Sequence, residues 1–578
     1  MAIKKYVADA DTTIVNAFQS NLETRGTGAN CGEADILETF SIYGRETTAS
    51  AELSRILIKF PVADISTDRT AGIIPASGNV SFYLKLYNAE TSKTVPRDYT
   101  LSVLAVSQSW QEGTGLDLEG YKDLTFSKNV GSNWMSASNA ADSYWKDISN
   151  TLLAGGSYHT GASGHSPGQE IHLFTQDFTT GLENLELDIT PLVEQWMASD
   201  AGDGTSGDGW PNYGVGIHMS QSFEAFVSGA DDPRTSRLID VPDPATSGQS
   251  VIYNPSGSTK SYFTKRFFAR GTQYFFKKPV IEARWNDSRQ DDRGQFYYSS
   301  SLAPAEDNLN TLYFYNYVRG KLTDIPALGV DKRIYVSLCS GNYNNTAPSS
   351  SGIQVLSPDG SGLASQTYGV RTAYPTVVTG GIVSTGIYSC SFAFTGSSDL
   401  THVFDVWWTG SEEVANFTSL DGDGADSIKQ FFTGSIIPKT LEASEIADRS
   451  RYYLNITNLR DKYRKDETAR FNLYIRNKDW SPTIYSKANK NIETTTIFTA
   501  SYRVYRVLDG YDAISYGTGS DKHTVMSYDV SGNYFDLDMS LLEPGYQYAF
   551  KISFYDAELS SWLEQPYNFK FRVEEYEY

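Results

Sequence analysis

The sequence predicts an all-β chain of three consecutive β-sandwich domains, of jelly-roll or immunoglobulin-like type, with one short helix in the first. Short segments of alternating apolar and polar residues recur along the chain, and Val80–Leu86 is the clearest of them. The 47 glycines, with many serines, threonines, asparagines and aspartates, supply the turns that many short strands need. At 578 residues and 40% apolar composition, the chain is too long for one core and apolar enough for several.

The first predicted domain spans residues 1–290. Leu101–Val106 and Val215–Met219 continue the alternation that a half-buried strand requires. A single helix is predicted where Thr190 provides an N-cap and Pro191 fits the first helical position. The apolar residues that follow it, between 192 and 197, form one stripe, so this helix should pack against the first core.

The second predicted domain spans 296–440 and the third spans 444–578. Four apolar segments have the spacing of a sandwich in the second domain: 312–318, 334–338, 386–392 and 403–407. In the third, Pro544 and Gly545 turn the chain into a strand that contains Tyr548. This resembles the tyrosine corner of fibronectin type III domains, which implies that the Tyr548 hydroxyl bonds to backbone upstream.

Charge and cysteine content restrict the partners and the place of synthesis. The net charge of −21 and the pI near 4.8 disfavour nucleic acid, because phosphates repel an acidic field. No run of about 18 apolar residues predicts a membrane span, and the first residues lack the apolar segment of a secretory signal. Cys31, Cys339 and Cys390 form no disulfide framework, and the sequence leaves open whether the last two lie close together. We therefore expect synthesis in a reducing cytoplasm.

A basic and aromatic stretch between residues 258 and 285 stands out in this acidic chain. Its cations are opposed only by Glu282, and six of them are predicted to be electrostatic anchors of an interface: Lys260, Lys265, Arg266, Arg270, Lys277 and Lys278. The partner would be an acidic protein surface or the acidic remainder of this chain. A solvated strand edge protected by lysines is the alternative.

Loop tryptophans and one aspartate-rich loop are the other candidate binding residues. Trp134, Trp145 and Trp210 are predicted in loops, where contact with a glycan and contact with a protein are the two alternatives. Asp421, Asp423 and Asp426 space three carboxylates as a calcium loop does, although a solvated turn has the same composition. No other cofactor is expected. Because the chain has neither a nucleophile elbow nor a phosphate loop, it is predicted not to be an enzyme.

Several motifs of the first 235 residues resemble the DNRLRE-type β-sandwich domain. They are Asp9–Ile14, Ser54–Phe60, the strand before Trp110–Gly113, and Asp188–Trp196 followed by Asn212–Ile217. Such domains occur in secreted and cell-surface proteins, some attached to polysaccharide-degrading enzymes. The long insertions at 120–180 and 197–212 depart from that family, which puts an inherited sugar site in doubt.

The chain as a whole resembles virion structural proteins of marine tailed phages, especially cyanophages. The resemblance extends through Tyr262–Gly271 and Phe296–Pro304. It implies a non-enzymatic structural protein on the particle exterior, in the tail, neck, baseplate or capsid decoration. The implied partners are other virion proteins, with multiple copies of the chain per particle. A glycan-binding adhesion protein that uses the loops of the first sandwich is the alternative function.

Overall fold

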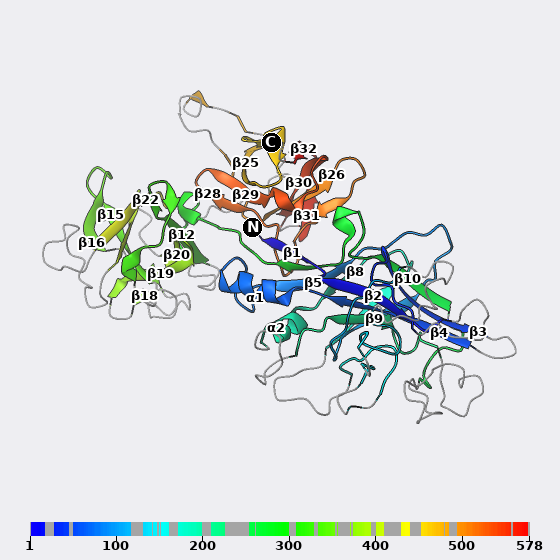
Figure 1. The fold of residues 1–578 in the computed structure, drawn as a ribbon. Coiled ribbons are helices and arrows are strands. Elements are labelled where there is room, and N and C mark those ends of the chain that lie inside the picture. The colour runs from blue at the N-terminus through cyan, green and yellow to red at the C-terminus, as the bar shows by residue number, and fades with distance from the viewer. Residues whose placement is uncertain are drawn as a thin grey trace. The chain divides into compact units, whose positions relative to one another are not determined.

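The computed structural model (Figure 1) falls into two compact units. Unit 1 comprises Met1–Asp287, Tyr516–Thr524 and Ser540–Gly545, and unit 2 comprises Ser288–Ser515, Val525–Met539 and Tyr546–Tyr578. The structure describes residues 2–17, 28–44, 50–116, 131–140, 143–146, 150, 152–160, 172–198, 210–225, 254–260, 262–299, 308–328, 333–352, 355–356, 370–371, 374–394, 400–409, 429–439, 452–478, 480–481, 483–484, 494–556 and 559–575.

Unit 1 contains two antiparallel sheets. The first has the strand order β1 (Ile3–Val7), β11 (Val280–Arg284), β5 (Ser81–Leu86) and β8 (Leu185–Asp188). The second has the order β10 (Tyr262–Phe268), β3 (Ile36–Gly44), β4 (Ser50–Lys59), β9 (Val215–Met219), β6 (Tyr99–Ala105) and β7 (Leu173–Phe178), and β2 (Ala10–Val15) pairs with β4. The N-terminal end of the chain is thereby joined to its middle, because β1 pairs with β11 across more than 270 residues.

Strand alternation builds the core of unit 1. On β5, Phe82, Leu84 and Leu86 are fully buried and point inward, while the residues between them are half-buried. Leu101 and Val103 of β6 belong to the same apolar cluster. The first sheet and the second sheet therefore share one interior, as a sandwich requires.

Two helices flank this core. The predicted helix is present as α2 (Thr190–Ala198), with Leu192, Val193 and Trp196 buried. The expectation of only one helix is wrong, because α1 (Val62–Thr70) follows directly after β4. Its sequence is mostly polar and buries only Val62 and Ile65, so it lacks a strong apolar period. Arg69 of α1 makes a bidentate ion pair with Glu194 of α2, at 2.6 and 2.7 Å.

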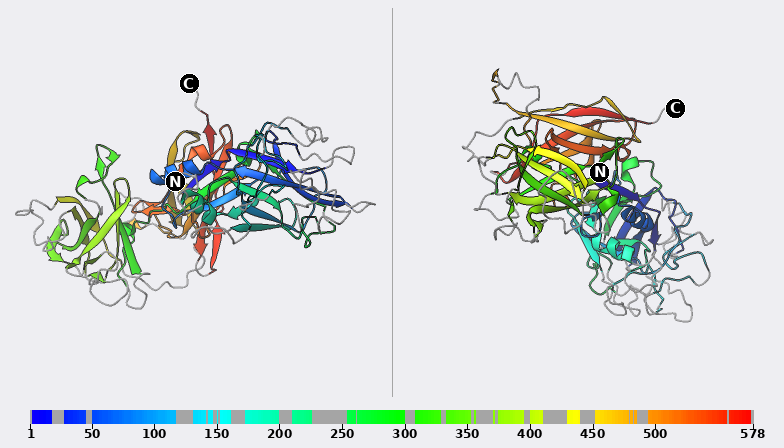
Figure 2. Two further views of the ribbon diagram at one scale, coloured as in Figure 1. Left: turned by 60° about the horizontal axis from the view of Figure 1, so that its bottom comes forward. Right: turned by 90° about the vertical axis from the view of Figure 1, so that its left-hand side faces the viewer.

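The first part of unit 2 is a sheet that encloses its own apolar cluster, and Figure 2 shows its strands, in green, around a common interior. Phe314 of β12 stacks on Phe432 of β22 at 5.5 Å, so the first and last strands of the sheet order approach each other. The order is β12 (Leu309–Tyr315), β20 (Ile387–Phe394), β19 (Tyr374–Ser384), β15 (Ile334–Gly341), β21 (Val403–Thr409) and β22 (Lys429–Ile436). The shorter strands are β13 (Tyr317–Val318), β14 (Lys321–Leu322), β16 (Pro348–Gly352), β17 (Val355–Leu356) and β18 (Val370–Arg371).

The remainder of unit 2 contains two sheets that pack through aromatic side chains. The Phe471 ring on β25 lies 4.7 Å from that of Phe550 on β30, and Tyr502 stacks on Phe535 at 4.1 Å. One sheet has the order β23 (Tyr452–Ile456), β25 (Thr468–Asn477), β29 (Gly532–Asp538) and β28 (Ser527–Asp529). The other has the order β24 (Lys462–Arg464), β32 (Phe569–Glu574), β30 (Gln547–Asp556), β26 (Ala500–Arg506) and β27 (Asp512–Ile514), with β31 (Ser561–Glu564) paired to β30.

The prediction of an all-β chain is confirmed, since strands dominate every described part of both units. The domain boundaries at 1–290, 296–440 and 444–578 stay a prediction. Within the described residues, neither of the two α-helices has the length and apolar character needed to span a bilayer.

Candidate functional site

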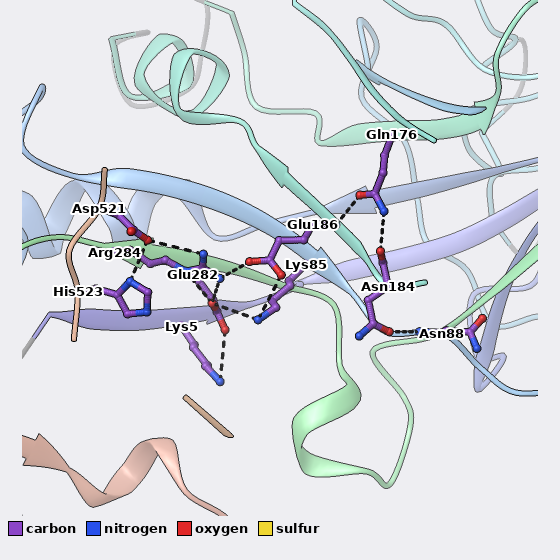
Figure 3. A network of polar contacts seen from close by, with 10 residues as sticks. All are labelled: Lys5, Lys85, Asn88, Gln176, Asn184, Glu186, Glu282, Arg284, Asp521 and His523. Atoms are coloured by element: carbon purple, nitrogen blue, oxygen red, sulfur yellow. Dashed lines mark hydrogen bonds and ion pairs between the residues drawn. The ribbon is translucent and has the colours of Figure 1, made fainter. Parts of the chain in front are cut away.

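The outer face of the first sheet of unit 1 carries a network of charged side chains (Figure 3). The strand register places Lys5 beside Glu282, and Lys85 beside Glu186. Glu282 is only 4% exposed, and it accepts hydrogen bonds from Arg284 Nη2 at 2.6 Å and Nε at 3.0 Å. The Nζ atoms of Lys5 and Lys85 lie 3.4 and 3.7 Å from the same carboxylate. One buried carboxylate therefore meets three cations.

Arg284 links this cluster to a distant part of the chain. Its Nη2 lies 2.6 Å from Glu186 Oε1, and its Nη1 lies 3.8 Å from Asp521 Oδ2. Asp521 also contacts His523, with 2.8 Å between Oδ2 and Nδ1. Both residues come from Tyr516–Thr524, which belongs to unit 1 although it follows β11 by more than 230 residues. The network thus holds a late segment of the chain against the first sheet.

The charges of the network control each other's ionisation. Burial by itself raises the pKa of Glu282, but its three cationic neighbours outweigh burial and hold that pKa well below its usual value. Burial lowers the pKa of Lys5, and the charge of Glu282 opposes this effect. Burial also raises the pKa of Asp521, but a hydrogen bond from His523 and the Arg284 charge lower it overall. Glu282 and Asp521 therefore stay ionised at neutral pH, which suits an electrostatic lock rather than a general base.

Side-chain amides join the edges of the two sheets next to this network. Gln176 of β7 donates from Nε2 to the carbonyl of Asn184 at 2.7 Å and accepts from the Glu186 backbone N–H at 2.8 Å. Asn184 Oδ1 accepts from the Asn88 backbone N–H at 2.8 Å. Figure 3 shows Gln176, Asn184 and Asn88 next to one another, beside the ion network. The amides replace a strand-to-strand ladder between β7 and β8, and so protect both edges.

Lys265 is buried, so the prediction that it anchors a partner at the surface is wrong. It is 2% exposed, and its Nζ donates to Asn88 Oδ1 at 2.7 Å and to the carbonyls of Gly181 and Glu183 at 2.9 and 2.7 Å. The ammonium also lies 4.9 Å from the centre of the Phe178 ring. Burial lowers the pKa of Lys265 to about 8. Its three donors are used inside the fold, so none remains for a neighbour.

Two predicted anchor arginines pair with carboxylates of this chain. Arg266 Nη2 lies 3.1 Å from Glu38 Oε2 on the neighbouring strand β3, and its side chain remains 48% exposed. Arg270 donates three hydrogen bonds to Glu112, at 2.8 to 3.0 Å. This arrangement matches the second alternative for the basic stretch, in which its partner is the acidic remainder of the chain.

The other predicted anchors lie nearer the surface. Lys260 is exposed, and Lys277 and Lys278 are half-buried. Lys277 Nζ lies 4.7 Å from the centre of the Phe268 ring and 5.5 Å from that of Tyr274, as in a cation–π pair.

The three candidate contact tryptophans are buried, which contradicts their predicted role. Trp134 and Trp145 are fully buried, and Trp210 is 5% exposed. Trp145 donates from Nε1 to the carbonyl of Asn133 at 2.8 Å, and the Trp210 ring packs on His159 with centroids 3.5 Å apart. A ring without an open face cannot stack on a sugar, so these side chains act as core beneath the loops.

Sequence reasoning missed a buried ion pair on β4. Arg55 donates to both carboxylate oxygens of Glu224 at 3.1 Å and to the Gly155 carbonyl at 2.9 Å. His218 lies 3.7 Å from Glu224, and burial, reinforced by the charge of Arg55, lowers its pKa. A single arginine inside the apolar run 54–60 was the available signal.

A second buried charged group is Asp11, on β2. It is 2% exposed and accepts a hydrogen bond from the Arg270 backbone N–H at 2.5 Å. Burial, together with the nearby charge of Glu112, raises the pKa of Asp11 to about 7. This carboxyl therefore changes its charge near neutral pH.

The remaining predictions have these outcomes. Asp421, Asp423 and Asp426 lie outside the described residues, and among the described residues no three His, Cys, Asp or Glu side chains are grouped so that they could hold a metal ion. In the expected tyrosine corner, Gly545 has φ +89° and Tyr548 is fully buried. The hydrogen bond of its hydroxyl stays a prediction. Cys339 and Cys390 are free thiols in separate apolar clusters.

No protein-family model and no curated protein matches the chain. Among solved structures, it is similar to a chimeric titin Z1Z2 tandem carrying a fibronectin peptide, at 9% identity over 46% of this chain and 91% of the other, with a TM-score of 0.13. It is also similar to the IG1 and IG2 domains of DIP-gamma, at 10% identity over 47% and 91%, with a TM-score of 0.11.

A third similar structure is a calcium-stabilised adhesin with which an Antarctic bacterium binds ice. The identity is 9% over 98% of this chain and 100% of the other, and the TM-score is 0.12. TM-scores and identities this low carry no functional argument.

Proposed function

We propose that the chain is a non-enzymatic structural component of a tailed-phage virion, on the particle exterior and held by protein–protein contacts. The assignment to a phage particle is based on two segments, Tyr262–Gly271 and Phe296–Pro304, that resemble virion proteins of marine phages. We favour the tail–neck apparatus over the baseplate or capsid decoration. Other virion proteins are the expected partners.

The observation that carries a structural role is the closed ion network of Figure 3. Its buried members Glu282 and Arg284 are saturated by partners within unit 1, at distances from 2.6 to 3.8 Å. Arg55 is likewise held by Glu224. Charged groups used in this way fix strands and distant segments to each other, and they leave no activated base for chemistry.

A glycan-binding adhesin is the alternative from another class. It requires aromatic faces open to a sugar, and Trp134, Trp145 and Trp210 do not provide them. No observation on the described residues favours it over the structural role.

Mass spectrometry of purified particles, after heads and tails are separated, tests the proposal. We expect the chain in the tail fraction at a fixed ratio to the other tail proteins. Absence from both fractions would overturn the virion assignment. If the purified full chain hydrolysed a polysaccharide, and a control preparation without the chain did not, the proposal that the protein is not an enzyme would be overturned.

A further inference from the structure

The outward face of strand β10 carries large side chains that are unusually open to solvent. β10 is an edge strand, paired with β3 on one side. Alternation puts Tyr262, Arg266 and Phe268 on this face, and Ile42 of β3 lies directly across from Tyr262. Tyr262 is 68% exposed and Ile42 is 42% exposed, so the two form an apolar pair in contact with water.

The same face continues beyond the end of the strand. The Tyr274 ring lies 5.4 Å from that of Phe268, and Tyr274 is 51% exposed. Lys277 Nζ sits 4.7 Å from the centre of the Phe268 ring. We call the set Ile42, Tyr262, Arg266, Phe268, Tyr274 and Lys277 the β10 strip. At about 3.3 Å per residue, its strand part alone is about 20 Å long.

Exposed aromatic side chains of unit 1 concentrate on this segment. Among the residues of unit 1 that the structure describes, the largely exposed aromatic ones are Tyr262, Tyr274 and Phe275. Tyrosine, phenylalanine and arginine are the residues enriched at protein interfaces, and exposed aromatic groups that cluster commonly mark a contact site. All three lie within fourteen consecutive residues of the chain.

The charge of the strip identifies the chemistry of its partner. Four cations lie on the strip or next to it in the sequence: Arg266 and Lys277 in the strip, and Lys260 and Lys278 beside it. Two carboxylates oppose them, Glu38, which pairs with Arg266, and Glu52, which lies across from Ile42, so positive charge is in surplus. The chain as a whole has a net charge of −21, so this local positive charge is opposite in sign to that of the rest of the protein. A carboxylate-rich protein surface complements it, and attraction of opposite charges would orient the encounter.

We propose that the β10 strip docks on an acidic surface of a neighbouring virion protein, with Tyr262 and Tyr274 as apolar anchors. The inference rests on the proposed function and adds the surface and the partner chemistry. Lys277 and Arg266 fix the orientation, while buried Lys265 holds β10 in place from the opposite face. The predicted anchors thus divide into surface contacts and internal support.

Photo-crosslinking in assembled particles tests the docking. The full chain carries p-benzoyl-phenylalanine in place of Tyr262 or Tyr274, and in place of Tyr317 as a control that is 62% exposed in unit 2. We expect the first two positions to crosslink to one virion protein, through a peptide rich in aspartate and glutamate. A crosslink to a second copy of the chain or to nucleic acid would overturn the proposal, as would no crosslink at either position.

A double variant, Tyr262→Ser with Tyr274→Ser, gives an independent measurement. Loss of both anchor side chains lowers occupancy in particles at least about tenfold at limiting chain concentration. Tyr317→Ser should leave occupancy unchanged. Wild-type occupancy of the double variant overturns this inference alone, whereas absence of the wild-type chain from particles overturns the proposed function and the inference with it.

Discussion

Replacing Glu282 with glutamine removes the central charge of the network on the first sheet. Glu282 has a side chain only 6% exposed, with Arg284 at 2.6 Å, Lys5 at 3.4 Å and Lys85 at 3.7 Å. Removing one partner of a buried ion pair costs about 3–5 kcal/mol. Arg284 keeps Glu186 as a partner, so we expect the lower end, about 3 kcal/mol.

Glu186→Gln is the matched control. This carboxylate contacts Arg284 and Lys85 as well, at 2.6 and 3.7 Å, but its side chain is 41% exposed. Solvent screens such a pair, so the expected cost is at most about 1 kcal/mol. The two variants therefore change the same network by one charge each and differ in burial.

Hydrogen exchange of the full chain, followed by mass spectrometry, measures the effect locally. Amides of β11 and β5 should exchange about a hundredfold faster in Glu282→Gln, since each 1.4 kcal/mol corresponds to about tenfold. Glu186→Gln should change them less than about tenfold. Equal protection in Glu282→Gln and wild type, or equal losses in both variants, would refute the electrostatic lock.

Three further predictions concern other buried groups. Asp11 has a folded pKa near 7, above its unfolded value of 3.8, so its charge penalises the fold above pH 7 and the penalty is relieved as pH falls. Asp11→Asn should therefore raise the urea midpoint most at pH 8, less at pH 5, and hardly at all below pH 3.8, where the carboxyl is protonated in both states; an equal shift at pH 8 and pH 5 would contradict this. Lys265→Met strands the carbonyls of Gly181 and Glu183 and should cost about 2–4 kcal/mol, against less than about 0.5 kcal/mol for Lys260→Met, both measured by urea unfolding. Trp145→Ala empties a fully buried site and should cost about 3–5 kcal/mol, with a lower thermal midpoint by calorimetry. Unaltered melting would show that this ring is not core.

Local patterns predicted the parts of the fold that depend on neighbouring residues. The alternation of 80–86 corresponds to β5, and the predicted helix is α2. Thr190 is its first residue and not its N-cap, because the Thr190 hydroxyl accepts from the Phe82 backbone N–H and donates to Asp188. Helix α1 could not be found in this way, because its side chains are mostly polar and it is held by packing and by Arg69. Periodicity reports only the faces that bury apolar residues.

The candidate site depended on contacts that local sequence does not encode. Lys265 is buried because backbone carbonyls more than 80 residues earlier in the chain surround its ammonium. Trp134, Trp145 and Trp210 do lie in loops, as predicted, but they are buried because other segments of the chain pack over them. Asp521 joins Arg284 from the far end of the chain. Such pairs join residues that are far apart in the sequence. The sequence therefore shows which residues are charged, but not which residues they pair with.

The location of the chain in intact particles shows whether it is a structural component of the particle exterior. Gold-labelled antibodies raised against the purified full chain would be applied to unbroken virions and imaged by electron microscopy. We expect label on the outside of the particle, concentrated at one region of the tail or neck. Particles that contain no label, or that bind it only after disruption, would contradict an exterior structural role.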